Sequence, residues 1–235
     1  SGLATAHIAK SLAQQANSRL EAAVESAAMA VTIAPGSPIT WLRLAETQLY
    51  SGNSQNAQEA IDRALALDPG NARGLSLTGL LALFAHDLSA AEQAFVEALE
   101  REPSTPEAHL GLGLVKLRQG DTQAARAALD LALSLNPNQS LLRVVLGEVF
   151  FAEHQHAKAE TQWQLAQTLD PLEPTPLFYQ GVLQLLENDP VQALEDFEHA
   201  RALDPNRSVI RAPPLMASDS AARAAALGQH IVSLA

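Results

Sequence analysis

The chain has 235 residues and a formal net charge of -11, from 15 Lys and Arg against 26 Asp and Glu. This charge repels phosphate backbones and anionic lipid surfaces, so nucleic acid is not an expected partner. There is no Cys, which excludes disulfides, thiolate metal sites and Cys nucleophiles, and no apolar run approaches the roughly 18 residues that a membrane-spanning helix needs.

The chain begins Ser1-Gly2 without a Met, and its first ten residues lack the order of a signal peptide. We therefore expect a soluble fragment of a longer protein, with no direct membrane insertion. Redox context cannot be assigned from the missing Cys, because both reducing and oxidising compartments tolerate it.

Six prolines divide the chain at a constant interval of 34 residues. Two columns of Ala keep the same interval, one ending at Ala193 and the other at Ala200. Such a period indicates tandem structural repeats. The prolines are Pro35, Pro69, Pro103, Pro137, Pro171 and Pro205, and the repeats that we predict span residues 4–37, 38–71, 72–105, 106–139, 140–173 and 174–207.

Each unit contains two apolar stripes of helical spacing separated by a polar break, which predicts two helices per repeat. The breaks carry residues that tolerate a left-handed backbone at a helix end. They are Gly52-Asn53, His86-Asp87, Gly120-Asp121, His154-Gln155 and Asn188-Asp189. Asp189-Pro190, Ser37-Pro38 and Thr105-Pro106 combine a capping side chain with a proline at the first helical position, so we expect helices to start there. The recurring proline ends each second helix, because it cannot continue the hydrogen-bond ladder.

Small residues recur in the first helix of the later repeats, where we expect it to approach its partner helix closely. They are Gly79, Gly113, Gly147 and Gly181. The second helices carry a large apolar side chain that would fill the same space, namely Phe95, Trp163 and Phe197.

These residues resemble the tetratricopeptide repeat family over residues 4–205. The second repeat shows the family spacing best, through Trp41, Leu44, Ala45, Ala57, Ile61, Ala64 and Pro69. The resemblance implies an all-α fold, a right-handed α-solenoid, or superhelix, of antiparallel helical hairpins. The first copy departs most, with Lys10, Ser11 and Ala27, as expected of a terminal unit that is exposed on one side.

After Pro205 the period is lost. We expect an irregular linker over residues 208–217 and a helix over residues 218–235, which is either a cap or the first helix of a truncated seventh repeat. Its stripe of Ala224, Leu227, Gly228 and Ile231 has the spacing of Arg143, Leu146, Gly147 and Phe150. The stretch from Asn206 to Gly228 also resembles the region after the repeats in some bacterial envelope proteins. Composition and this stretch favour a bacterial protein of the cytoplasm or periplasm, with the envelope preferred.

No motif in the sequence points to catalysis. There is no glycine-rich phosphate loop, nucleophile elbow or zinc-protease motif, so we predict no enzyme, no catalytic residue and no cofactor. His154 and His156 lie two apart in a predicted turn, where three or four convergent zinc ligands are not available. His7 and His109 share the repeat position of Trp41, which favours a packing role.

The candidate site is a second stripe on the first helices, which the family resemblance places on a concave groove. Its residues are Leu42, Glu46, Leu49, Tyr50, Leu80, Leu83, Phe84, Leu110, Leu114, Leu117, Arg118, Val144, Glu148, Phe151, Phe178, Val182 and Leu185. Arg43, Arg73, Arg118 and Glu148 are expected at its rim. Family members that grip a terminal carboxylate have Lys and Asn at these positions, whereas this chain has apolar residues and Glu, so an apolar or amphipathic segment is the expected ligand.

Three functions remain open from the sequence. The first is a protein-protein interaction scaffold that binds a peptide, a helix or a partner subunit in the groove. The second is a structural spacer or assembly module within a larger bacterial envelope or export protein. The third is the docking arm of an enzyme whose catalytic domain lies elsewhere. The apolar stripe also predicts that residues 210–216 or a second copy of the chain could fill the groove, the latter by self-association.

Overall fold

The computed structural model describes residues 2–17 and 19–203, and these fold into helices joined by short turns. The predicted linker 208–217 and helix 218–235 lie outside the described residues. The helices in chain order are α1 (Gly2–Ala16), α2 (Leu20–Ile33), α3 (Pro38–Tyr50), α4 (Ser54–Leu67), α5 (Ala72–Phe84), α6 (Leu88–Arg101), α7 (Pro106–Arg118), α8 (Thr122–Leu135), α9 (Ser140–Ala152), α10 (His156–Leu169), α11 (Thr175–Leu186) and α12 (Pro190–Ala202).

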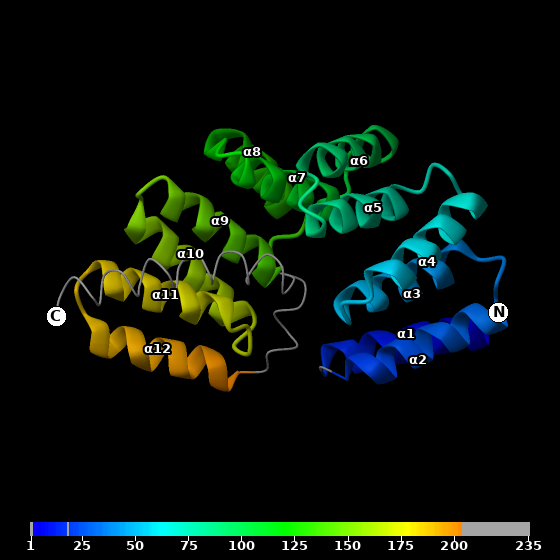
Figure 1. Cartoon of the computed structure of the whole chain (residues 1–235), viewed down its shortest axis with the longest axis horizontal. Helices are drawn as coiled ribbons and strands as arrows, with labels where there is room; N and C mark the ends of the chain where they lie inside the picture. The colour runs from blue at the N-terminus through cyan, green and yellow to red at the C-terminus, as the bar shows by residue number, and fades with distance from the viewer. Residues whose placement is uncertain (1, 18, 204–235) are drawn as a thin grey trace.

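The twelve helices form six hairpins, each made of an odd-numbered helix packed on the even-numbered helix that follows it. Each even-numbered helix from α2 to α10 also contacts the first helix of the next hairpin, so the hairpins stack in chain order. Figure 1 shows the stack curving into an arch, with α5 and α7 on its inner side and α6 and α8 on its outer side. The prediction of an all-α solenoid of antiparallel hairpins is confirmed.

The side of the stack that carries the odd-numbered helices is the more closely packed. Consecutive odd-numbered helices touch from α1 to α9, whereas no pair of even-numbered helices has more than a marginal contact within the described residues. The hairpins therefore converge along the odd-numbered helices and diverge along the even-numbered ones, which produces the curvature.

The turns inside the second to sixth hairpins are each made by a residue with a left-handed backbone. These residues are Gly52, His86, Gly120, His154 and Asn188, with φ between 57° and 81°. In each turn the N–H of the next residue donates to the carbonyl five residues earlier, as when Asp121 N donates to Lys116 O at 2.9 Å. This is the Schellman arrangement of a helix end, and it confirms the five predicted breaks.

The prolines that follow a capping residue start α3, α7 and α12, as predicted. The caps themselves differ. The Asp189 carboxylate accepts from Gln192 N at 3.1 Å, but Ser37 and Thr105 make no side-chain capping bond. The Thr105 hydroxyl instead donates to Glu102 O at 2.9 Å, across the turn between α6 and α7. A hydroxyl can satisfy either the helix start or the preceding turn, and here the turn prevails.

The core of the third to sixth hairpins contains a large side chain that lies against a glycine. A Cβ added at Gly79 would come within 2.8 Å of the Phe95 ring, and one added at Gly113 would come within 2.8 Å of Leu129. Gly147 lies in the same way against Trp163, and Gly181 against Phe197. The predicted close approach is confirmed, and it sets the distance between the two helices of a hairpin.

None of the described helices is both long enough and apolar enough to span a membrane.

Candidate functional site

The candidate surface is the set of partly exposed side chains on the odd-numbered helices, which we call the inner face. The structure leaves twelve of the predicted site residues partly exposed there. They are Glu46, Tyr50, Leu80, Phe84, Leu114, Leu117, Arg118, Glu148, Phe151, Phe178, Val182 and Leu185. From α5 to α11 this set is mostly apolar. Its polar members are Glu46 and Tyr50 of α3, Arg118 at the end of α7, and Glu148 within α9.

Five predicted site residues are buried instead. They are Leu42, Leu49, Leu83, Leu110 and Val144, with at most 8% of each exposed. Leu110 packs with Leu142 and Val145 of the next hairpin, and Val144 packs with Tyr179. These side chains fill the space between consecutive hairpins, so they cannot contact a ligand in this conformation.

Two exposed apolar residues share repeat positions with the predicted set but were left out of it. Leu12 precedes Glu46 by 34 residues, and Leu186 lies at the repeat position of Tyr50. Their exposed fractions are 49% and 59%. Extending each 34-residue column into the end repeats would have found them, and they lengthen the apolar part of the inner face.

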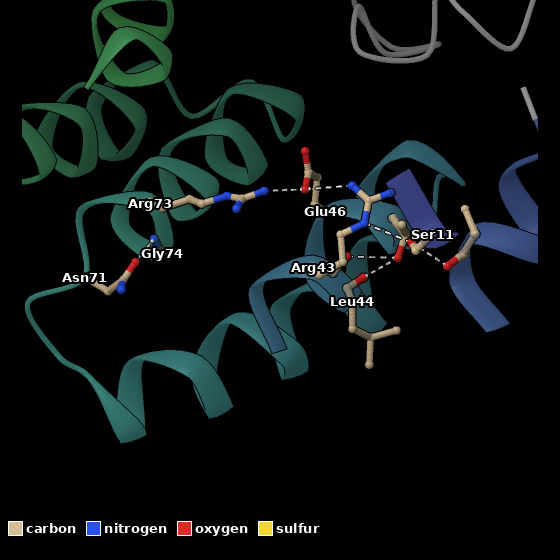
Figure 2. Close-up of polar contacts among 9 residues, drawn as sticks. Ser11, Arg43, Leu44, Glu46, Asn71, Arg73 and Gly74 are labelled. Atoms are coloured by element: carbon tan, nitrogen blue, oxygen red, sulfur yellow. Dashed lines mark hydrogen bonds and ion pairs between the residues drawn. The ribbon is translucent and has the colours of Figure 1, made fainter. Parts of the chain in front are cut away.

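Arg43 is not at the rim, so that part of the sequence prediction is wrong. Only 1% of its side chain is exposed, and it lies at the junction between the first two hairpins. Its Nε donates to the Ser11 hydroxyl at 2.9 Å, and its Nη1 donates to Glu46 Oε2 at 3.0 Å. Figure 2 shows the Glu46 carboxylate between the guanidinium groups of Arg43 and Arg73, the latter at 2.6 Å.

Ser11 is likewise buried rather than exposed at the end of the array. Its hydroxyl donates to Ala23 O at 2.8 Å while accepting from Arg43. One hydroxyl therefore joins the two helices of the first hairpin to the second hairpin. A serine serves better here than the larger or apolar residue of the family pattern, because the facing side chain is an arginine.

The polar end of the inner face perturbs a neighbouring tyrosine. Burial, and next the negative charge of Glu46, raise the pKa of Tyr50 far above its usual value of 10.0. The Tyr50 phenol therefore stays neutral even at alkaline pH and adds no charge to the inner face.

The opposite end of the inner face is aromatic. The rings of Trp163 and Tyr179 stack at 5.2 Å with an interplanar angle of 10° across the junction of the last two hairpins. Phe151 lies against both rings, at 5.9 Å and 6.3 Å, and the His156 ring stacks on it at 5.4 Å. This cluster supports Phe178, which stays partly exposed on α11.

The histidines that could suggest a metal have other positions in the fold. His154 forms the left-handed turn between α9 and α10. Nε2 of His109 lies 2.9 Å from Pro103 O, which matches the bond from Trp41 Nε1 to Pro35 O at 2.8 Å. Within residues 2–17 and 19–203, no three His, Asp or Glu side chains gather where they could hold a metal ion.

The repeat spacing, the paired helices and the glycine contacts agree with what the family comparison finds. The tetratricopeptide repeat model matches residues 42–83 and 76–140. These matched residues belong to the tetratricopeptide repeat family. No curated protein sequence is significantly similar to it.

Solved structures of other tetratricopeptide repeat proteins share this fold over most of the chain. A protein of Parabacteroides merdae is 19% identical, with a TM-score of 0.67 over 90% of this chain and 82% of that one. PilF of Pseudomonas aeruginosa is 23% identical, with a TM-score of 0.60 over 87% and 93%. A chain of the APC/C hetero-tetramer Cut9-Hcn1 is 15% identical, with a TM-score of 0.74 over 89% of this chain and 42% of that one. At these identities the likeness concerns the fold.

The tetratricopeptide fold is that of a general protein-protein interaction scaffold, so the expected partners are proteins.

Proposed function

We propose that this tetratricopeptide repeat protein holds an apolar or amphipathic protein segment, or a partner subunit, against its inner face. The observation that supports the proposal most is the run of partly exposed apolar side chains on four successive odd-numbered helices. They are Leu80 and Phe84 of α5, Leu114 and Leu117 of α7, Phe151 of α9, and Phe178, Val182 and Leu185 of α11.

The energetics suit a reversible complex. Burying about 600 Å² of apolar surface contributes on the order of 15 kcal/mol before the costs of association and ordering are subtracted. Those costs remove about half of it or more, which leaves micromolar affinity. Exposed apolar surface of this extent on a folded protein usually marks an interaction site.

The polar end of the inner face at α3 would fix the orientation of a bound segment. Glu46 is already neutralised by Arg43 and Arg73, so the pair of arginines leaves one positive charge in excess. A segment that crosses the inner face would therefore place an apolar stretch over α5 to α11 and tolerate an acidic residue beside Arg73.

Binding to an array of 15-residue apolar and amphipathic peptides tests the proposal. We expect a Leu114→Glu, Phe151→Glu double variant to lose at least tenfold in affinity, because both charges fall on the inner face. A Leu131→Glu, Leu165→Glu double variant is the matched control, since both leucines are exposed on the outer helices α8 and α10.

Circular dichroism would establish that each variant is folded, and Leu114→Glu with Val182→Glu replaces the first pair if Phe151→Glu disturbs the aromatic cluster. Equal binding by the wild type and the folded inner-face variants would exclude the inner face. It would favour the alternative functions, a spacer within a larger envelope or export protein or the docking arm of an enzyme.

A further inference from the structure

The last described hairpin has an open side where the first five hairpins are closed. The repeat position that holds Phe95 and Trp163 in the second helices is at most 1% exposed in the first five hairpins. Phe197 occupies this position in α12 and is partly exposed. Ala200 is also partly exposed, although its five equivalents are fully buried. In the earlier hairpins the next unit in the stack covers these positions.

One exposed apolar residue extends this open side. Leu194, also on α12, is 59% exposed. We call the surface formed by Leu194, Phe197 and Ala200 the end face.

Earlier junctions show what the position of Leu194 does. Its equivalent in α6 is Glu92, which contacts Lys116 Nζ at 2.6 Å and accepts from Gln119 Nε2 at 2.8 Å, both in the next hairpin. Its equivalent in α8 is Arg126, which lies 3.4 Å from Glu153 of the next hairpin. At these two junctions the repeat position faces the following unit, whereas Gln58 and Glu160 at the same position bond within their own helices. In α12 the position holds a leucine instead of a charge.

We propose that the end face is covered by residues 218–235 of this same chain, docked as the first helix of a seventh unit. These residues lie outside the described part of the structure. The chain continues for 32 residues beyond Leu203, the residue that follows α12, so no separate molecule is needed to reach the face.

The register of the docked segment follows from its stripe. Aligning Ala224, Leu227, Gly228 and Ile231 with Arg143, Leu146, Gly147 and Phe150 places Ile231 at the repeat position of Lys116. The same alignment places Leu234 at the position of Gln119 and Glu153. In this proposed register Ile231 and Leu234 would face Leu194.

Compared with the junction of the third and fourth hairpins, both sides of the proposed contact are apolar. Where the third and fourth hairpins meet, Glu92 faces Lys116 and Gln119. At the end face a leucine would face an isoleucine and a leucine, so an apolar pair replaces a charged one. A charge facing these aliphatic side chains would be buried without a partner, at a large cost, and the chain places none there.

Disulfide trapping tests the contact directly, because the chain has no Cys of its own. We expect the Leu194→Cys, Ile231→Cys variant to oxidise within one molecule, with loss of both free thiols and no dimer on a non-reducing gel. The control pair is Leu194→Cys with Gln229→Cys, two residues away and on another side of a helix. Equal trapping in both pairs, or none in either, would overturn the proposal, as would a disulfide-linked dimer, which would assign the end face to a second copy.

A double-mutant cycle in the full chain gives a second readout. Leu194→Asp and Ile231→Asp should each lower the melting temperature by about 2–4 °C, and the double variant should fall no further than the more damaging single one. Leu131→Asp, on an exposed leucine of α8, is the control. Its effect on the melting temperature should be additive with that of Ile231→Asp. Full additivity of Leu194→Asp with Ile231→Asp would show that the two residues do not meet.

Discussion

The junction of the first two hairpins and the junction of the last two use the same repeat positions with opposite chemistry. The position that holds Trp163 near the C-terminal end holds Ala27 in the first hairpin, and the position of Tyr179 holds Arg43 in the second. One junction is an aromatic stack, and the other contains a buried guanidinium with a hydroxyl and a carboxylate as partners. The repeat thus fixes the space that must be filled, and different side chains fill it.

The two junctions are expected to respond differently to the removal of a side chain. An aromatic stack is stabilised by burial and dispersion, so its loss scales with the volume removed. A buried charge depends on each of its partners, because an unpaired one costs far more than its bond contributed. Arg43 Nη2 has no hydrogen-bond partner within the described residues. We therefore expect the loss of any remaining partner of Arg43 to destabilise this junction strongly.

The largest effect is expected at the aromatic junction. Trp163→Ala should lower the free energy of unfolding by about 3–5 kcal/mol, because it leaves a cavity between Gly147 and Tyr179. Urea unfolding followed by circular dichroism measures this. Trp163→Phe is the matched variant and should cost less, since Phe95 and Phe197 occupy the same repeat position. If the two variants lost the same stability, the volume argument would fail.

The next effect is expected at the polar junction. Glu46→Ala should cost about 3 kcal/mol, the lower end of the range for breaking a buried ion pair, because water reaches Glu46, whose side chain is 18% exposed. Arg43→Met is the comparison, and it should change the free energy of unfolding by about 1 kcal/mol or less, since Glu46 keeps Arg73. A larger loss in Arg43→Met than in Glu46→Ala would contradict this account of the buried charge.

A middle junction provides an intermediate case. A Cβ at Gly111 would overlap the Phe95 ring of the preceding hairpin, so Gly111→Ala should cost about 1–3 kcal/mol by overpacking. Combining it with Phe95→Leu should recover part of the loss, because the smaller side chain frees space. The double variant is measured by the same urea unfolding, and a simple sum of the two losses would argue against direct contact.

The smallest effect is expected for the surface link between the third and fourth hairpins. Hydrogen bonds from Lys116 and then Gln119 hold the pKa of Glu92 below its usual value of 4.5. A carboxylate with a lowered pKa in the folded state stabilises the protein above about pH 4.5 and loses that contribution as the pH falls through the lowered pKa.

Glu92→Gln should therefore cost well under 1 kcal/mol at pH 7, because the pair is partly exposed, and the difference from wild type should shrink below pH 4.5. Urea midpoints at several pH values between 3 and 7 test the sign. A difference that grew as the pH fell would reverse the assigned direction of the pKa shift.

The sequence predicted the features that depend on local residue type. Pro38, Pro106 and Pro190 start helices because their fixed φ suits a first helical turn. His86 and Asn188 adopt the left-handed backbone conformation, because a helix that ends in a Schellman turn requires that conformation at this position. Such features recur every 34 residues, so six copies reinforce one prediction.

The features that the sequence did not predict depend on what lies opposite. Arg43 was expected at the rim because its helix position alone does not reveal Ser11, 32 residues earlier, as its partner. Leu110 and Val144 were expected on the surface because the side chains of the next hairpin that cover them are visible only after the hairpins are stacked. Leu12 and Leu186, by contrast, follow from the repeat positions and needed no structure.

The unequal packing on the two sides of the array has a mechanical consequence. Consecutive odd-numbered helices contact one another from α1 to α9, while the even-numbered helices stand apart from one another within the described residues. An array joined along one side bends most easily by opening or closing its other side. Its softest deformation would therefore alter the curvature while keeping the spacing of Leu80, Leu114 and Phe151 along the odd-numbered helices nearly constant.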